Sequence, residues 1–227
     1  MFGFRPLDRH GKIKENLEGG SPMPFEIVRN DITNMRVDAI VNTANPHPVI
    51  GSGTDTMIHA KAGPQLLLAR QQIGDIARGN AAITPAYKLN AAYVIHTVGP
   101  VWLDGNHDEE MLLRSCYENA LNLALEYGCQ SVAFPLISTN NYGFPKDKAL
   151  QIAIAAFSAF LTEHEMHIYL VVFNRGAYHL SEKLFRNLAS YIDDHYVDLW
   201  EESTYGGEKE YHQQSIRRRR DFSLFRK

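Results

Sequence analysis

Two turn-rich segments of the sequence combine residue types that can bind an anion. They are NTANPHPVIGSGTD (42–55) and ISTNNYGFP (137–145), and each follows an apolar run and precedes a stretch with helical periodicity. A Gly-x-Gly turn that opens a helix, here Gly51 to Gly53, presents backbone N–H groups and the positive end of the helix dipole, which together favour pyrophosphate. An isolated Gly-x-Gly is more often an ordinary tight turn. The chain has neither GxxxxGK[ST] nor a full GxGxxG, which disfavours a nucleoside triphosphatase or a standard dinucleotide site.

Asp55 lies where the helix after the first segment would begin, and its carboxylate has two interpretations. An acid in the first turn stabilises the helix dipole, and Ser52 or Thr54 would then provide the capping side chain. The same carboxylate, at the edge of an anion pocket, is a candidate for chemistry. Both interpretations can hold at once.

The histidines and cysteines form no metal-binding pattern. His59 and His96 have no second ligand at a useful spacing, so we expect them to satisfy internal hydrogen bonds. Cys116 and Cys129 form neither a CxxC pair nor a zinc spacing, so we expect two buried thiols. No metal and no cofactor are expected.

Two kinds of hydrophobic pattern alternate along the chain. Short runs rich in Val, Ile, Phe and Tyr predict strands, and stretches with apolar residues every three or four positions predict helices. This order is typical of an α/β fold with a largely parallel, mixed sheet and helices on both faces, where ligands bind beyond the carboxyl ends of the strands. The predicted strands are Phe25–Val28, Asp38–Asn42, Asn80–Pro85, Tyr93–Thr97, Ser131–Leu136 and Ile168–Phe173. The predicted helices are Thr54–Ala62, one that begins at Pro64, Asp108–Tyr127, Lys146–Glu163 and Tyr178–Tyr196.

Length and charge set the domain organisation. The 227 residues, 44% of them hydrophobic, suffice for one buried domain, which we place at 23–197, between an arm (1–22) and a polar, then basic tail (198–227). Residues 208–227 hold seven Lys or Arg against three acids, so this stretch is +4 and residues 1–207 are −7, for a chain of −3. The charge disfavours nucleic acid as a partner of the body and leaves it open for the tail. No run of about 18 apolar residues and no secretory signal occur, so we expect a cytoplasmic protein with no membrane partner.

Five sequence blocks together resemble the macrodomain family, especially its MacroD-type ADP-ribosyl hydrolases and O-acetyl-ADP-ribose deacetylases. The blocks are NDIT (30–33), VDAIVNTAN (37–45), GSGTDTMIHAKAG (51–63), YVIHTVGPVW (93–102) and FPLISTNNYGFP (134–145). Each block alone is a weak signal, but five in the family's order, within about residues 24–197, are specific. The resemblance implies a three-layer α/β/α fold with a mixed central sheet and a cleft that holds ADP-ribose.

The resemblance also implies roles for individual residues. Asp31 corresponds to the acid at the adenine amino group, Asn45 to the asparagine at the distal ribose, and Asp55 to the catalytic acid. Tyr142 corresponds to the aromatic residue near the distal ribose, or it is a lid on the core, and core packing is the simpler role for Phe173. The other residues implied at ADP-ribose are Ile32, Gly51, Ser52, Gly53, Thr54, Ser138, Thr139, Asn140, Asn141, Gly143, Asn174 and Tyr178.

Several positions depart from the family pattern, among them Pro46, His47 and Pro48, which stiffen the first loop and leave fewer backbone donors. Ser52 and Thr54 stand where the family usually has glycine and valine, so Ser52 narrows the space around the diphosphate. Asn140 stands where a glycine is usual, and asparagine tolerates a positive φ better than other non-glycine residues. These departures bear on substrate preference more than on fold.

The implied reaction cuts the bond between C1 of the distal ribose and a carboxylate, or the acetyl bond of O-acetyl-ADP-ribose. An aspartate is a poor general base at pH 7, so our hypothesis is that Asp55 orients a water that the substrate's phosphate helps to activate, while Asn45 holds the ribose hydroxyls. The partner would be ADP-ribose or a protein carrying mono-ADP-ribose on acidic side chains. One alternative is a non-catalytic reader of ADP-ribose. Another is an RNA or poly(ADP-ribose) binder that uses Arg217–Arg220, a run that is equally typical of a solvated or protein-docking tail.

Overall fold

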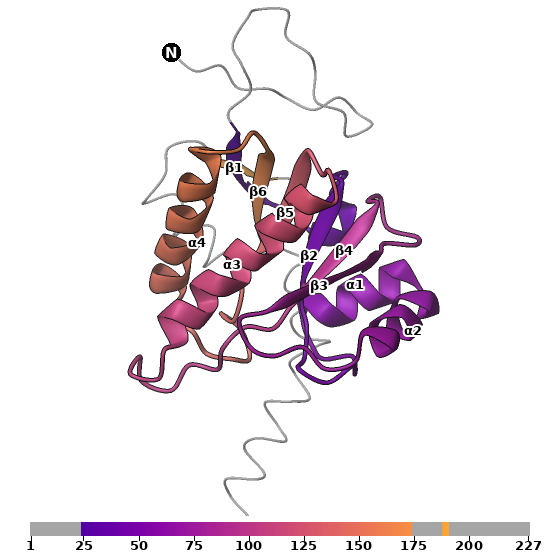
Figure 1. Cartoon of the computed structure of the whole chain (residues 1–227), viewed down its shortest axis with the longest axis horizontal. Coiled ribbons are helices and arrows are strands. Elements are labelled where there is room, and N and C mark those ends of the chain that lie inside the picture. Colours follow the sequence, from indigo (N-terminus) through magenta and orange to yellow (C-terminus); the bar gives the residue numbers. More distant parts are fainter. Residues whose placement is uncertain (1–23, 174–187, 191–227) are drawn as a thin grey trace, which may run out of the picture.

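Apolar runs of five or six residues form a single sheet, which the computed structural model describes within residues 24–173 and 188–190 (Figure 1). The strand order is β3-β4-β2-β5-β6-β1-β7, with β3 antiparallel to β4 and the other neighbouring pairs parallel. The mixed, largely parallel sheet expected from the sequence is therefore confirmed. The strands are β1 (Phe25–Arg29), β2 (Ala39–Thr43), β3 (Ala81–Pro85), β4 (Tyr93–Thr97), β5 (Ser131–Pro135), β6 (His167–Val172) and β7 (Leu188–Ser190).

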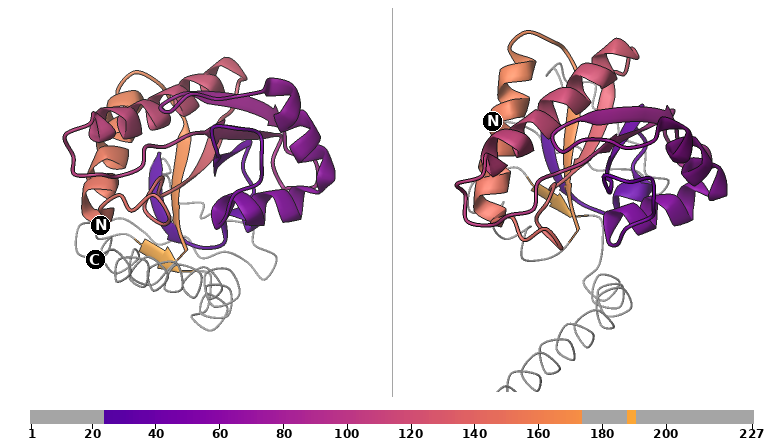
Figure 2. Two further views of the ribbon diagram at one scale, coloured as in Figure 1. Left: turned by 90° about the horizontal axis from the view of Figure 1, so that it is seen from below. Right: turned by 60° about the horizontal axis from the view of Figure 1, so that its bottom comes forward.

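Successive side chains of a strand point to opposite sides of the sheet. Because consecutive residues of the central strands are apolar, both faces of the sheet are apolar. In β2, Ala39 and Val41 pack in one buried cluster with residues of α3 and α4, and Ile40 packs in a second cluster with residues of α1 and α2. Figures 1 and 2 show the α3 and α4 pair on one side of the sheet and α1 on the other. The fold therefore has three layers, α/β/α, as expected. The helices are α1 (Thr54–Ala62), α2 (Pro64–Ile73), α3 (Glu109–Glu126) and α4 (Lys146–Leu161), with a 3₁₀ turn η1 at Ile32–Asn34.

The larger cluster, between the sheet and the α3 and α4 pair, holds most of the aromatic core. Phe157 of α4 is fully buried, and its ring centroid lies 4.9 Å from Phe134, 5.3 Å from Tyr117 and 5.5 Å from Phe25. Both cysteines belong to this cluster and are free, buried thiols, as predicted. Among the described helices, none is long and apolar enough to span a bilayer.

Local signals predicted where the helices begin better than how they are capped. Pro64 occupies the first turn of α2, and Gly128, with φ of 69°, follows the end of α3, as expected. The capping prediction for α1 was wrong, because neither Ser52 nor Thr54 caps it. The N-cap is Gly53, which makes no side-chain hydrogen bond and has φ of 63° and ψ of −130°, a conformation that a residue with a Cβ adopts only with strain.

The helix predicted over Tyr178–Tyr196 was wrong at Leu188–Ser190, which forms strand β7. This segment pairs in parallel with Ile27–Arg29 of β1 and becomes the strand beyond it in the sheet. Pairing with an available strand overrides local helical periodicity, because it satisfies the backbone groups along that side of β1.

The aromatic core yields a stability prediction. Phe157→Ala should lower the free energy of unfolding by about 3 to 5 kcal/mol, because it leaves a cavity among three other rings. The matched control is Leu68→Ala in α2, whose side chain is 60% exposed and should change stability by no more than about 0.5 kcal/mol. Equilibrium unfolding in urea measures both. Equal losses would contradict the packing described here.

Candidate active site

Two loops form a pocket at the carboxyl ends of β2 and β5, which are neighbouring parallel strands. The first loop, residues 44–53, connects β2 to α1, and the second loop, residues 136–145, connects β5 to α4. The pocket encloses about 650 Å³, its open mouth included. None of the described residues that line it carries a charge. They are Thr43, Ala44, Asn45, Gly51, Ser52, Gly53, Thr54, Gly99, Leu136, Ile137, Ser138, Thr139, Asn140, Asn141 and Tyr142.

The first loop is held from below by the carboxylate of Asp55, in the first turn of α1. One carboxylate oxygen accepts a hydrogen bond from the backbone N–H of Gly51 at 2.5 Å, and the other accepts one from Asn42 Nδ2 at 2.5 Å. The side-chain hydroxyl of Thr56 donates to the carbonyl of Gly51 at 2.6 Å, which holds the same residue from its other side. Asp55 is only 2% exposed and is not among the pocket-lining residues, so it lies beneath the loop.

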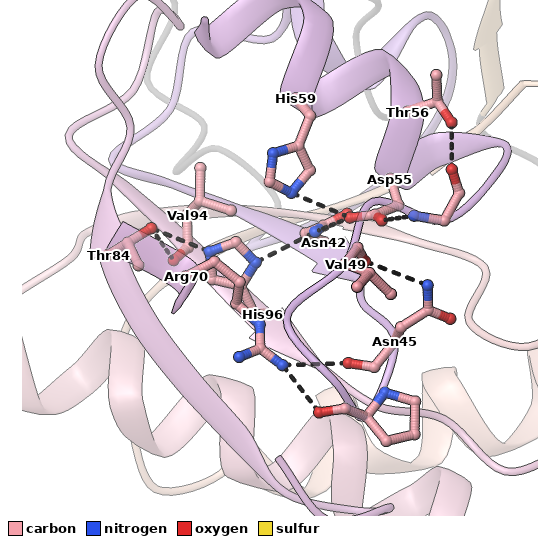
Figure 3. A network of polar contacts seen from close by, with 12 residues as sticks. Asn42, Asn45, Val49, Asp55, Thr56, His59, Arg70, Thr84, Val94 and His96 are labelled. Atoms are coloured by element: carbon pink, nitrogen blue, oxygen red, sulfur yellow. Dashed lines mark hydrogen bonds and ion pairs between the residues drawn. The ribbon is translucent and has the colours of Figure 1, made fainter. Parts of the chain in front are cut away.

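A buried row of polar groups continues from Asp55 across the sheet (Figure 3). Asn42 Nδ2 also lies 3.2 Å from His96 Nδ1, and His96 Nε2 lies 3.0 Å from the hydroxyl of Thr84. Because Asn42 Nδ2 can only donate, His96 Nδ1 must accept and Nε2 must carry the proton. Burial lowers the pKa of His96 to about 3, so its ring is neutral at pH 7, and both ring nitrogens make the internal hydrogen bonds predicted for it.

His59 lies beside the same carboxylate, with Nε2 3.4 Å from Asp55 Oδ1 (Figure 3). Burial lowers the pKa of His59, and the Asp55 charge opposes this shift only in part. Its Nδ1 has no hydrogen-bond partner within the described part of the chain, and Nε2 makes only the contact with Asp55, so the expectation of satisfied internal hydrogen bonds was wrong at Nδ1.

Arg70 of α2 fixes the backbone of the first loop, a role that we did not anticipate from the sequence. Its guanidinium donates to the carbonyl oxygens of Asn45 and Pro46, each at 3.1 Å, and to that of Gly74. The residue is only 2% exposed, and Figure 3 shows it reaching the loop from the side of the network. A buried guanidinium with three carbonyl acceptors leaves the Asn45 backbone little freedom.

Polar side chains connect the two loops across the pocket. Asn45 Nδ2 donates to the carbonyl of Val49 at 3.2 Å, and Asn45 Oδ1 lies 3.5 Å from the hydroxyl of Tyr142. Asn141 Nδ2 of the second loop donates to the hydroxyl of Ser52 in the first. The structure thus brings Asn45 and Tyr142 together at one end of the pocket.

Ser138 has the unusual backbone conformation of the second loop. Its φ is 64°, and its carbonyl accepts the N–H of Phe144 at 3.0 Å, which closes the turn. Asn140 does not have a positive φ, so the tolerance of asparagine for that conformation is not needed there; the positive φ lies two residues earlier. The Ser138 Oγ is buried without a hydrogen-bond partner in the described region and lies against Gly99, where an added Cβ would approach it to 2.1 Å.

Gly99 is the pocket residue whose importance we missed. It lies in the TVGP turn beyond β4, at the same edge of the sheet as both loops, and its lack of a side chain lets Ser138 approach. A glycine two residues after a predicted strand was the available signal. Gly143, by contrast, was predicted to contact the ligand and is not among the lining residues; its N–H donates to the Asn140 carbonyl at 3.0 Å.

The residues predicted to lie at adenine follow β1 and β6, farther along the same edge. Asp31 is 4% exposed, and one carboxylate oxygen accepts from the N–H and hydroxyl of Thr33 at 2.9 and 2.8 Å. Ile32 is buried, and Phe173, directly after β6, is partly buried. None of these three lines the pocket between the two loops. The remaining two predicted residues, Asn174 and Tyr178, lie outside the described residues.

One cluster in residues 24–173 has the composition of a metal site, and its hydrogen bonds explain it without a metal. Asp104, His107 and Glu109 bring their ligand atoms within 4.8 Å of one another. The buried Glu109 carboxylate accepts four backbone N–H groups of the preceding turn, and His107 Nδ1 lies 3.0 Å from Asp104. We therefore interpret this cluster as a brace for the turn before α3.

Comparison with known proteins places these features in one class. The sequence profile of the Macro domain family matches residues 41–153. An O-acetyl-ADP-ribose deacetylase of Escherichia coli is 46% identical over 166 residues, which cover 70% of this chain and 94% of the relative. A macro domain-containing protein of Chlorobaculum tepidum is 49% identical over 146 residues, covering 64% of this chain and 84% of the relative.

Solved structures agree with the sequence comparisons. The Oceanobacillus iheyensis macrodomain with ADP has a TM-score of 0.67 at 38% identity, covering 70% of this chain and 89% of that one. The Trypanosoma brucei macrodomain in complex with ADP-ribose has a TM-score of 0.66 at 36% identity, covering 70% of this chain and 68% of that one. Fold and pocket define a three-layer α/β/α protein with a ligand cleft at the carboxyl edge of its sheet. The chain belongs to the macrodomain family.

The neutral, buried His96 yields a prediction of pH dependence. The pKa of His96 is about 3 in the folded state and about 6.5 when it is free, so the unfolded state binds more protons between these values. The contribution of His96 therefore makes stability fall as the pH drops from 6.5 towards 3, by up to about 1.4 kcal/mol per pH unit.

His96→Gln should make the free energy of unfolding less dependent on pH than in the unaltered protein. Urea unfolding at pH 7.5, 6.5, 5.5 and 4.5 measures the slope. The matched control is Leu68→Ala in α2, which removes no titratable group and should keep the original slope. Identical slopes for His96→Gln and the unaltered protein would show that His96 does not stay neutral in the fold.

Proposed function

We propose that the protein binds ADP-ribose in the pocket between the two loops and hydrolyses acyl esters of its distal ribose. The substrates would be mono-ADP-ribose on acidic side chains, O-acetyl-ADP-ribose, or both. The observation that carries the proposal is the arrangement of Asn45, Gly51 and Asp55 at the N-terminus of α1, beside a pocket that no charged side chain of the described residues lines. The relatives named O-acetyl-ADP-ribose deacetylase and the macrodomain bound to ADP-ribose support the same ligand.

The pyrophosphate would lie between Gly51–Gly53 and Ser138–Gly143. Since no lysine or arginine of the described residues lines the pocket, the negative charge of the pyrophosphate would be met by backbone N–H groups and the positive end of α1. The Ser138 hydroxyl, buried and without a hydrogen-bond partner among residues 24–173, would supply one further donor to a phosphate oxygen. Binding through backbone N–H groups would explain why the pocket is lined by uncharged residues of two loops.

The distal ribose would lie at Asn45 and Tyr142, whose polar atoms face each other across the pocket at 3.5 Å. Adenine would extend in the other direction, towards Asp31, Ile32 and Phe173 at the ends of β1 and β6. In hydrolysis of the ester to an acidic side chain, a water oxygen bonds to C1 of the ribose, the C1–O bond breaks, its electron pair leaves with the carboxylate, and the proton of the water passes to solvent. Holding both reactants in place would supply most of the rate.

Asp55 would act mainly through the loop above it. Both of its carboxylate oxygens accept hydrogen bonds from the protein, and the residue is almost fully buried, which leaves it poorly placed to remove a proton from water. A Cβ added to Gly51 would lie 2.9 Å from Asn45 Nδ2 and 3.3 Å from Asp55 Oδ2. The loop is thus packed tightly between the two, and we propose that the Asp55 charge positions Gly51 and, through it, the Asn45 amide and the attacking water.

Binding of ADP-ribose is tested first, with Gly53→Val as the diagnostic variant. Valine strains the positive φ of Gly53 and fills the space proposed for the diphosphate, so affinity for ADP-ribose should fall about tenfold or more. Isothermal titration calorimetry with ADP-ribose, ADP and adenosine measures it. If adenosine bound the unaltered protein as tightly as ADP-ribose, the diphosphate would contribute nothing and the proposed pose would fail.

Turnover is tested with Asp55→Ala and Asn45→Ala. Loss of Asp55 should lower kcat on a glutamate-linked mono-ADP-ribosylated protein roughly 100-fold while weakening ADP-ribose binding far less, since its proposed work is positioning. Loss of Asn45 should damage both, because it would hold the ribose itself. Release of free ADP-ribose gives kcat and KM, and circular dichroism confirms the fold.

Two outcomes would contradict this proposal in different ways. Full activity of Asp55→Ala would remove Asp55 from the mechanism. If the unaltered protein bound ADP-ribose and released none from glutamate, aspartate, serine or arginine linkages or from O-acetyl-ADP-ribose, the pocket would belong to a reader and not to an enzyme.

A further inference from the structure

Arg78 places a fixed positive charge at the rim of the pocket. It lies between α2 and β3, is exposed, and its NH1 group donates to the carbonyl of Gly99 at 2.6 Å. Its Cζ atom lies 5.2 Å from the ring centroid of Tyr142, within range of a cation–π interaction. Gly99 and Tyr142 both line the pocket, one beyond β4 and the other in the second loop. The guanidinium is therefore held by two contacts at the rim of the pocket.

The charge of Arg78 is not neutralised by the protein where side chains are described. The exposed Arg114 pairs with Glu118, and Lys148 pairs with Glu110, but no acidic side chain among residues 24–173 pairs with Arg78. A guanidinium has five N–H donors in a planar fork that matches a carboxylate, and the Gly99 carbonyl takes only one of them. The rim thus presents donors of the right geometry for a planar anion.

The position of Arg78 relates it to the proposed scissile bond, and the argument here rests on the proposed function. Tyr142 connects Arg78 to the proposed ribose site, since its ring faces the guanidinium and its hydroxyl lies 3.5 Å from Asn45 Oδ1. Whatever is attached to the distal ribose must leave the pocket at this end. Arg78 is exposed and contacts two residues that line the pocket. Arg70, in contrast, is buried and contacts the first loop from the interior.

We infer that Arg78 is a specificity-determining residue that selects acyl groups on the distal ribose by donating hydrogen bonds to the acyl oxygens. When the bond between ribose C1 and the carboxylate breaks, its electron pair leaves on an acyl oxygen, and the proton lost by the attacking water passes to solvent. The negative charge grows beside the guanidinium, so the interaction strengthens in the transition state. A guanidine-linked ADP-ribose, in contrast, would bring a second positive charge to the same place.

Arg78→Gln tests this inference, with Arg114→Gln as the matched control on an exposed arginine outside the pocket. On a glutamate-linked mono-ADP-ribosylated peptide, Arg78→Gln should lower kcat/KM about 10-fold to 100-fold, mainly through kcat. The Kd for free ADP-ribose, which carries no acyl group, should change less than about twofold. Arg78→Lys keeps the charge without the fork and should recover part of the loss. For an arginine-linked peptide, the affinity of Arg78→Gln should equal or exceed that of the unaltered protein, in contrast to the loss expected with the glutamate-linked peptide.

The same measurements can overturn the inference. Unchanged kcat/KM in Arg78→Gln would do so, and so would an equal loss in ADP-ribose affinity, because Arg78 would then serve only to support Tyr142. If the unaltered protein binds ADP-ribose but cleaves none of the substrates, the proposed hydrolase function is rejected. The role of Arg78 is then tested by binding affinity alone. Arg78→Gln must then lose affinity for the intact glutamate-linked peptide relative to ADP-ribose, and an unchanged ratio rejects the role. Absence of any ADP-ribose binding by the unaltered protein would reject both proposals.

Discussion

A buried carboxylate holds the first loop of the pocket in place. Burying a charge is costly unless hydrogen bonds replace its water, and Asp55 finds its donors in Gly51 and Asn42. The second amide proton of Asn42 goes to His96, which can accept it only while its ring is neutral. His59, beside the same carboxylate, has its pKa lowered by burial. The shape of the loop therefore depends on the protonation and hydrogen bonding of groups that lie behind the pocket and do not line it.

The sequence alone was enough to place the elements that carry the two loops. Continuous apolar runs predicted β2 and β5, helical periodicity predicted α1 and α4 after them, and the carboxyl-edge rule for parallel sheets predicted that the loops would meet. The family resemblance added which loop residues to expect, and most of those in the two loops line one pocket. The predictions of the elements and of the meeting of the two loops succeeded because each depends on a local pattern in contiguous residues. The roles of the loop residues at ADP-ribose stay predictions.

The predictions that failed depend on contacts between distant parts of the chain. β7 exists because β1 offers it a partner, and a single segment's periodicity cannot show this. Arg70 looks like a surface residue in the sequence, and its role appears only when the loop 24 residues earlier in the chain folds over it. Arg78 is similar, because its two contacts come from other elements. The positive φ at Ser138 follows from closure of a turn whose register the sequence left open.

The hydrogen bond between Asn141 and Ser52 joins two positions 89 residues apart, one in each loop. Both positions are exposed or partly exposed and neither supports the core, so each could vary freely if it stood alone. Because they share one bond, the effect of changing either depends on the residue at the other, and their energies are not additive. The contact between the two loops at this point is thus a property of the pair of residues and not of either residue alone.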